Sequence, residues 1–319
     1  MKLANLMEVF KGFFSEANQL KRVILLTGIA LVLSAVSFGS YYYWDRYVHI
    51  GDQSPVEKSI QELEDAVRQH PDEIELRLAL AESYMVDNRY ENAIEQAVKV
   101  LNAYPDNERA MFVVGVSYAN LENWEQAVAP LKSFAEARSK LPTAGMDSSL
   151  ETTLYFLGKS YIAMERFDDA IEPLSQAVQI NVTDADAFYL LGNAYAKTGQ
   201  HQLAVQNYEE AVRFVPNYTE AFQGMVTSYT ALDKADHAAY ARGMVAFSTK
   251  DYETARVELE KAVKGLSDFA PAFIGLGLTY EELGDLQSAK ANLEHALQID
   301  PNNYTASQAL GRVEAKMQN

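Results

Sequence analysis

Small, aromatic and apolar residues recur along this chain with a period of about 34 residues, and this periodicity constrains the fold more than any other feature. The stretch Ala185–Tyr218 shows the pattern best. Gly192 and Ala204 are small enough to let two antiparallel helices approach closely, Gly199 lies in the turn between them, and Pro216 ends the second helix. A helix pair of this kind leaves an apolar face that only a neighbouring pair can cover. The sequence therefore predicts stacked helix pairs.

This spacing resembles the tetratricopeptide repeat, a helix-turn-helix unit of about 34 residues. Two copies match the motif in register, and the matching residues are Gly192, Tyr195, Ala204, Tyr208, Ala211 and Pro216, and then Gly277, Tyr280, Ala289, Leu293, Ala296 and Pro301. The resemblance covers residues 55 to 319 and implies an all-α fold, a right-handed superhelical solenoid of these units. It identifies an architecture rather than a function.

The small residue of each first helix marks the successive units. These markers are Ala81, Gly115, Gly158, Gly192, Val226, Gly243, Gly277 and Gly311. Most of them follow one another at the full repeat, but the interval from Gly115 to Gly158 is longer and predicts an insertion near residues 139–150, where proline and glycine interrupt the helix. The interval from Val226 to Gly243 is half a repeat and predicts a half-repeat phase slip near residues 219–250. Either one helix changes role there and the solenoid stays continuous, or the array bends into two blocks.

The two ends of the array are expected to be incomplete units. Residues 55–70 carry second-helix motif residues without an ordinary first helix before them. Residues 303–317 form a lone first-type helix, which we expect to cap the array.

A membrane segment is predicted before the repeats. No charged residue occurs between positions 23 and 43, and this run meets the length of about 20 residues that a membrane-spanning helix needs. Basic residues precede the run and aromatic residues follow it, as at the two interfaces of a bilayer. We expect an amphipathic cytoplasmic segment at 1–22, a transmembrane helix at 23–44 and a linker at 45–54. A cleavable signal peptide is the alternative, because small residues offer cleavage spacing near residue 37.

The flanking charges also predict an orientation. More lysine and arginine residues precede the segment than follow it closely, so the chain is expected in the cytoplasmic (inner) membrane as a single-pass protein with its N-terminus inside and the repeats on the periplasmic side. Small residues at helical spacing predict packing against another transmembrane helix. These residues are Ala30, Ser34 and Ser37, with Ala35 and Gly39 as a second pair.

The charge balance points to protein partners rather than nucleic acid. The chain has a formal net charge of −17, and residues 55–319 hold 22 basic and 40 acidic residues. Such a surface repels phosphates, and a partner that it attracts by charge is expected to have a basic surface. The alternative is that the acidic residues only keep the array soluble.

The chemistry-bearing residues do not form a recognisable catalytic pattern. The chain has no cysteine, and its five histidines are scattered along the sequence without metal-ligand spacing. Carboxylate pairs such as Asp168-Asp169 and Glu281-Glu282 fall at helix ends, where the helix dipole accounts for acidic residues. We therefore predict no enzyme, no cofactor and no metal site.

The resemblance instead implies a partner-binding groove, because in this family the first helices line the concave face. The corresponding residues here are Phe112, Val113, Val116, Tyr155, Phe156, Lys159, Tyr189, Leu190 and Asn193. The alternative for each is packing between neighbouring helices. A carboxylate clamp of the co-chaperone type is not matched, since Tyr189 stands where its first lysine would be.

These observations together predict a membrane-anchored scaffold for protein-protein interaction, or an assembly factor for a membrane or envelope complex. The alternative is a permanent structural subunit of a multi-subunit membrane complex.

Overall fold

The structure is a computed structural model, and it describes residues 19–43 and 54–318 of the 319-residue chain. Side chains at 19–25, 27, 29 and 30 are outside this description. Within the described residues every regular element is helical, with 16 α-helices, one short 3-10 helix and no strand. The chain divides into two units, residues 1–65 and 66–319. The predicted segments at 1–18 and 44–53 lie outside the described residues.

The membrane prediction is wrong for the described part of the chain. Helix α2 spans Gln19–Tyr43, but no helix among the described residues is long and apolar enough to cross a bilayer.

This finding also overturns the predictions that depended on a membrane anchor. The predicted single-pass inner-membrane location, with the repeats on the periplasmic side, is not supported. A transmembrane helix as a partner is not supported either. Ser34, Ala35, Ser37 and Gly39 are exposed on α2, and the side chain of Ala30 lies outside the described residues.

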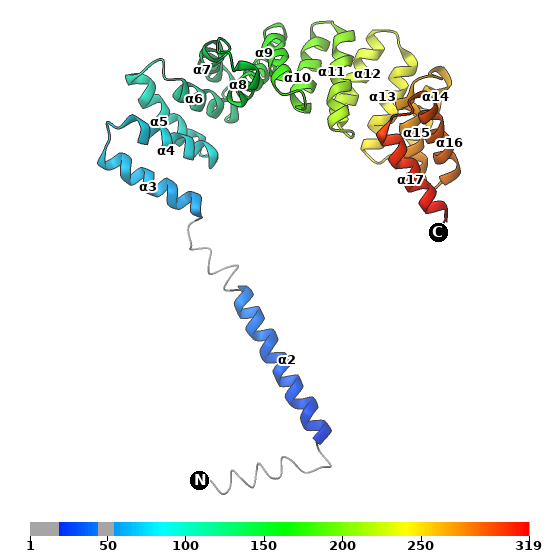
Figure 1. The fold of residues 1–319 in the computed structure, drawn as a ribbon, viewed down its shortest axis with the longest axis horizontal. Coiled ribbons are helices and arrows are strands. Elements are labelled where there is room, and N and C mark those ends of the chain that lie inside the picture. Colours follow the sequence, from blue (N-terminus) through cyan, green and yellow to red (C-terminus); the bar gives the residue numbers. More distant parts are fainter. Residues whose placement is uncertain (1–18, 44–53, 319) are drawn as a thin grey trace. The chain divides into compact units, whose positions relative to one another are not determined.

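The array consists of helices that follow one another in sequence order (Figure 1). Its first half contains α3 (Pro55–Gln69), α4 (Ile74–Val86), α5 (Tyr90–Ala103), α6 (Glu108–Asn120), α7 (Trp124–Arg138), the 3-10 helix η4 (Ala144–Met146), α8 (Ser148–Ala163) and α9 (Phe167–Ile180). Its second half contains α10 (Ala185–Lys197), α11 (His201–Phe214), α12 (Thr219–Ala231), α13 (Ala235–Ser248), α14 (Tyr252–Gly265), α15 (Ala270–Leu283), α16 (Leu286–Ile299) and α17 (Tyr304–Gln318).

Close contact between helices of one pair depends on glycine. A Cβ atom built on Gly192 would stand 2.7 Å from the ring of Tyr208, and one on Gly115 would stand 2.7 Å from the side chain of Leu131. These distances are too short for any other residue to fit unless the neighbouring side chain or helix shifts. The same relation holds in three further pairs, Gly158 with Leu174, Gly243 with Leu259 and Gly277 with Leu293.

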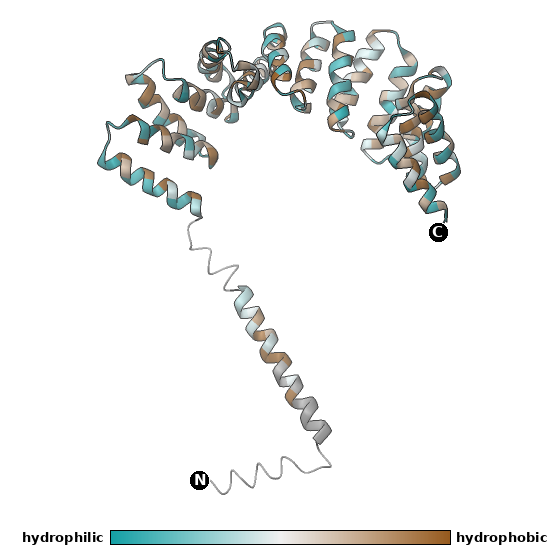
Figure 2. Cartoon of the chain, viewed as in Figure 1, coloured by the Kyte–Doolittle hydropathy of each residue, from teal (hydrophilic) through white to brown (hydrophobic). Residues whose placement is uncertain are grey.

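Local sequence fixes where the first helices begin. The side chains of Asn107, Asp147 and Asp184 each accept a hydrogen bond from a backbone N–H group in the first turn of α6, α8 and α10. Such caps satisfy donors that the helix itself leaves unpaired. Brown and teal residues share each helix of the array in Figure 2, as expected for amphipathic helices that bury one face.

The insertion between the second and third units is held by an arginine. Helix α7 ends at Arg138, and the chain passes through η4 to Asp147 at the start of α8. The Arg138 guanidinium donates to the Asp147 carboxylate, with an Nη2 to Oδ2 distance of 2.6 Å. Since Asp147 also caps α8, one carboxylate fixes both ends of the inserted segment.

Helix α13 lies at the half-repeat interval of the sequence. Helix α13 packs against α12 before it and α14 after it. Before this interval the first helices form one layer in which each contacts the following first helix: α4 with α6, α6 with α8, α8 with α10 and α10 with α12. After it the layer continues through α13, α15 and α17. The first-helix layer therefore passes from α12 to α13 without an intervening second helix. Residues 66–319 stay one compact unit.

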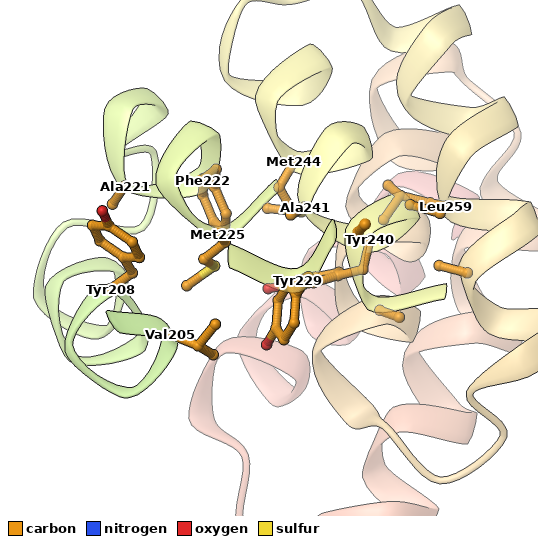
Figure 3. Close-up of a cluster of buried hydrophobic side chains, with 14 of the residues drawn as sticks. Val205, Tyr208, Ala221, Phe222, Met225, Tyr229, Tyr240, Ala241, Met244 and Leu259 are labelled. Carbon is orange, nitrogen blue, oxygen red and sulfur yellow. The ribbon is translucent and has the colours of Figure 1, made fainter. Parts of the chain in front are cut away.

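A large apolar cluster fills this transition. Figure 3 shows Phe222 and Met225 of α12 beside Tyr240 of α13, with Tyr208 of α11 on the other side of α12. The rings of Phe222 and Tyr240 meet edge to face with centroids 6.2 Å apart. Aromatic side chains supply much of the buried volume of this cluster.

Candidate protein-binding face

The candidate site is the surface that the first helices α6, α8, α10 and α12 form together. Each of these helices contacts the next first helix directly, as well as the second helix between them. Residues at equivalent positions of successive first helices are therefore neighbours, although they lie about one repeat apart in the sequence. We call this surface the first-helix face.

Seven of the nine predicted groove residues are half-buried on their helices, so each keeps part of its side chain accessible. They are Phe112, Tyr155, Phe156, Lys159, Tyr189, Leu190 and Asn193. The other two, Val113 and Val116, are only 0% and 7% exposed. These two valines belong to the core and offer no surface to a partner.

Two aromatic rings lie together among the half-buried residues of α8. The rings of Tyr155 and Phe156 meet edge to face with centroids 5.3 Å apart. The Lys159 ammonium lies 5.9 Å from the centroid of each ring. This distance is within the range of cation–π attraction, so the face already holds a cation against its aromatic rings.

A second aromatic group joins α10 to the start of α12. The rings of Tyr189 and Tyr218 lie 5.1 Å apart, and the Tyr218 hydroxyl donates a hydrogen bond of 2.6 Å to Oδ1 of Asp186. Burial and then the nearby Asp186 carboxylate raise the pKa of Tyr218 above its ordinary value. Tyr218 and Asp186 were not predicted as site residues. The sequence signal that could have found them is their place at the start of successive first helices.

Carboxyl groups collect beside these rings. Burial, and then a hydrogen bond and charge repulsion from Asp184, raise the pKa of Glu151 to about 7. Burial, followed by the negative charges of Asp186, Asp184 and Glu151, raises the pKa of Tyr155 to about 12. Carboxylates from α8 and α10 therefore act on one another and on the same tyrosine.

The described groups on this face can contact another molecule through apolar, polar and charged interactions. Among the described residues, no group of three or more histidine, cysteine, aspartate or glutamate side chains is placed to hold a metal ion. What the face offers is aromatic surface, a few amide and hydroxyl groups, and carboxylates. Such a surface suits a polypeptide segment.

The second helices carry a separate groove that the sequence did not predict. Two adjoining cavities of about 320 and 570 Å³ share Ser139, Glu172 and Gln176 as lining residues. Leu154 and Leu157 of α8 also line the first of them. The inserted residues contribute to this groove, because Ala144 and Gly145 line the second cavity.

Family models match most of the array. Residues 52–108 and 270–303 match two tetratricopeptide repeat models. Residues 85–222 match the C-terminal ARM domain of tetratricopeptide repeat protein 21. All three models describe helical repeats, which act as scaffolds, and none of the three describes a catalytic family.

Two curated relatives share part of this sequence. The protein CTR9 homolog of Arabidopsis thaliana is 26% identical over 151 residues, which is 45% of this chain and 12% of the relative. RNA polymerase II-associated protein 3 of Xenopus tropicalis is 27% identical over 127 residues, 40% of this chain and 17% of the relative. The chain thus spans less than a fifth of either relative's length.

Solved structures share the helical repeat as well. The structure of MamA from Desulfovibrio magneticus RS-1 is 19% identical, covering 56% of this chain and 97% of that one, with a TM-score of 0.48. A TM-score below 0.5 transfers no detail to this chain. The helix order and the repeat models agree, however, and over its described residues the chain is an all-α repeat solenoid of the tetratricopeptide type.

Proposed function

We propose that this protein is a non-enzymatic scaffold that binds a segment of another protein on its first-helix face, between α6 and α12. The observation that carries the proposal is the row of half-buried aromatic residues Phe112, Tyr155, Phe156 and Tyr189 on adjacent first helices. Partly exposed aromatic residues contribute large contact area at low conformational cost when a partner covers them.

The extent of the face suits a short polypeptide segment. Four consecutive first helices form it, so a partner can engage several units at once. Tetratricopeptide repeats bind protein partners in general, and which partner is bound depends on the surface residues rather than on the fold. The acidic balance of the repeat region favours a partner with a basic surface.

Substitution of the aromatic row tests this function. A variant with Phe112→Ser, Tyr155→Ser and Tyr189→Ser is expected to lose partner capture while it keeps its helix content. Capture is measured with a photocrosslinking residue at position 193, followed by identification of the crosslinked protein. Unchanged capture in the variant would place the partner on another face.

A matched control separates loss of the face from general loss of surface aromatic and apolar area. Tyr104, Val182 and Val257 are exposed and lie outside helices α6, α8, α10 and α12, after α5, after α9 and on α14. Changing these three to serine should leave capture unchanged. Circular dichroism melting of both variants shows whether either has lost stability.

Two modes of action fit the same face. A transient assembly factor releases its partner, whereas a permanent subunit stays in a complex of fixed stoichiometry. Purification through size-exclusion chromatography distinguishes the two: recovery as a free protein favours the factor, and co-elution in a fixed ratio favours the subunit.

A further inference from the structure

We propose that the segment bound on the first-helix face is cationic, and that an arginine or lysine of the partner lies between the carboxylates of α10 and α12 and the tyrosines beside them. This inference rests on the proposed function and names the chemistry of the partner.

Elsewhere in the array, basic residues neutralise the carboxylates of first helices. Arg109 of α6 reaches back to α4, where its guanidinium lies 2.6 Å from Glu75 and 2.8 Å from Glu82. At the other end, Arg312 of α17 lies 2.7 Å from Glu281 of α15. In both places an arginine on one first helix pairs with the first helix before it.

The position of Arg109 is acidic in the units that begin with α10 and α12. Arg109 lies six positions before the marker Gly115, and the residues six before Gly192 and Val226 are Asp186 and Glu220. Where α6 supplies a cation to its neighbour, α10 and α12 therefore supply anions. The interunit ion pair of the early repeats has no counterpart among the described contacts of these helices.

The result is a set of carboxyl groups without a cation. Among the described residues, no lysine or arginine forms an ion pair with Glu151, Asp184, Asp186 or Glu220. Lys159 is the nearby cation of this face, but its ammonium lies over the rings of α8. A partner's cation would relieve the repulsion between these carboxyl groups.

The aromatic residues make a cationic side chain the best-fitting occupant. The rings of Tyr189 and Tyr218 lie tilted against each other, and the Tyr218 hydroxyl donates to one oxygen of the Asp186 carboxylate. A guanidinium can pair with a carboxylate and stack on an aromatic ring at once. An acidic segment or a nucleic acid would meet the same carboxylates and be repelled.

Synthetic peptides provide the probe. Three 12-residue peptides alternate leucine with arginine, glutamine or glutamate, and their affinity for the full chain is measured by fluorescence anisotropy. The arginine peptide is expected to bind about tenfold more tightly than the glutamine peptide. Equal affinity of these two, or preference for the glutamate peptide, would overturn the inference.

A charge-matched pair of variants locates the effect. Asp186→Asn with Glu220→Gln is expected to weaken the arginine peptide by about tenfold. Glu125→Gln with Glu172→Gln changes the net charge equally, on the exposed sides of α7 and α9, and is expected to change affinity less than twofold. Equal losses in both variants would mean unspecific charge attraction and would overturn the inference.

The aromatic variant distinguishes this failure from failure of the proposed function. If the serine variant of Phe112, Tyr155 and Tyr189 loses all three peptides while charge makes no difference, the face binds polypeptide but not cations. If that variant binds every peptide as the unchanged protein does, both the face and the inference fail.

Discussion

The α4–α6 junction and the α10–α12 junction have the same helix packing but opposite surface chemistry. In both, two first helices contact each other and enclose a second helix. At the first junction Arg109 of α6 bridges to Glu75 and Glu82 of α4. At the second junction Glu220 takes the position of Arg109 and Asp186 takes the position of Glu75, so two carboxylates face the junction and Asp186 accepts a hydrogen bond from the Tyr218 hydroxyl. The repeat motif thus fixes the backbone, and residues outside the motif decide whether a junction is closed by its own ion pairs or open to a partner.

Substitution of the glycines at the helix contacts is expected to have the largest effect on stability. Gly115→Ala and Gly192→Ala should each lower the free energy of unfolding by about 2–3 kcal/mol, because a Cβ atom would collide with Leu131 or Tyr208. Gly311→Ala is the control, since a Cβ atom at this position of α17 would have nothing within 4 Å. That control should be neutral or stabilising by about 0.5–1 kcal/mol. Urea unfolding measures all three, and equal effects at the three sites would contradict the shared packing.

The charge difference should appear in the pH dependence of stability. The pKa of Glu151 is raised from 4.5 to about 7, so the folded state binds its proton more tightly than the unfolded state. The stabilisation that the protonated Glu151 gives the folded state is fully present below pH 4.5 and is lost as the pH rises through 7. The free energy of unfolding is expected to fall by about 1 kcal/mol over this range, after solvent screening. Glu151→Gln should flatten this part of the profile. Thermal melting between pH 4.5 and 7.5 measures the profile, and an unchanged slope in the variant would assign the effect to other groups.

The ion pairs of the first junction should contribute a smaller amount. Arg109→Met removes the guanidinium from two partly exposed carboxylates and is expected to cost about 0.5–1 kcal/mol at low salt. The effect should shrink in 0.5 M salt because the ion pairs are screened. Urea unfolding at both salt concentrations measures it, and a salt-independent loss would point to packing of the arginine stem instead.

Sequence periodicity predicts the helix pairs, because each motif residue has a local role. Gly192 meets Tyr208 on the very next helix, and a contact of this kind is visible within one repeat. Periodicity also brings Phe112, Tyr155 and Tyr189 to equivalent positions. It does not separate exposed from buried neighbours, so Val113 and Val116 were assigned to the groove although they are core residues.

Contacts between units were harder to predict. The hydrogen bond from Tyr218 to Asp186 joins residues 32 positions apart and depends on side-chain direction. At the half-repeat interval the spacing of motif residues does not distinguish a continuous solenoid from a bend. The core that joins α12 to α13 is built from residues outside the motif. Length and charge alone predict a membrane span in the apolar run near the N-terminus, but no helix among the described residues, α2 included, meets the requirement for one.

Mapping where a cationic peptide binds tests the central claim most directly. A leucine-arginine peptide that carries a photoreactive group is irradiated with the full chain, and the crosslinked residues are identified by mass spectrometry. Crosslinks are predicted on the first-helix face, at residues of α8, α10 and α12 such as Tyr155 and Asn193. Crosslinks confined to the second helices α7, α9 and α11 would contradict the account.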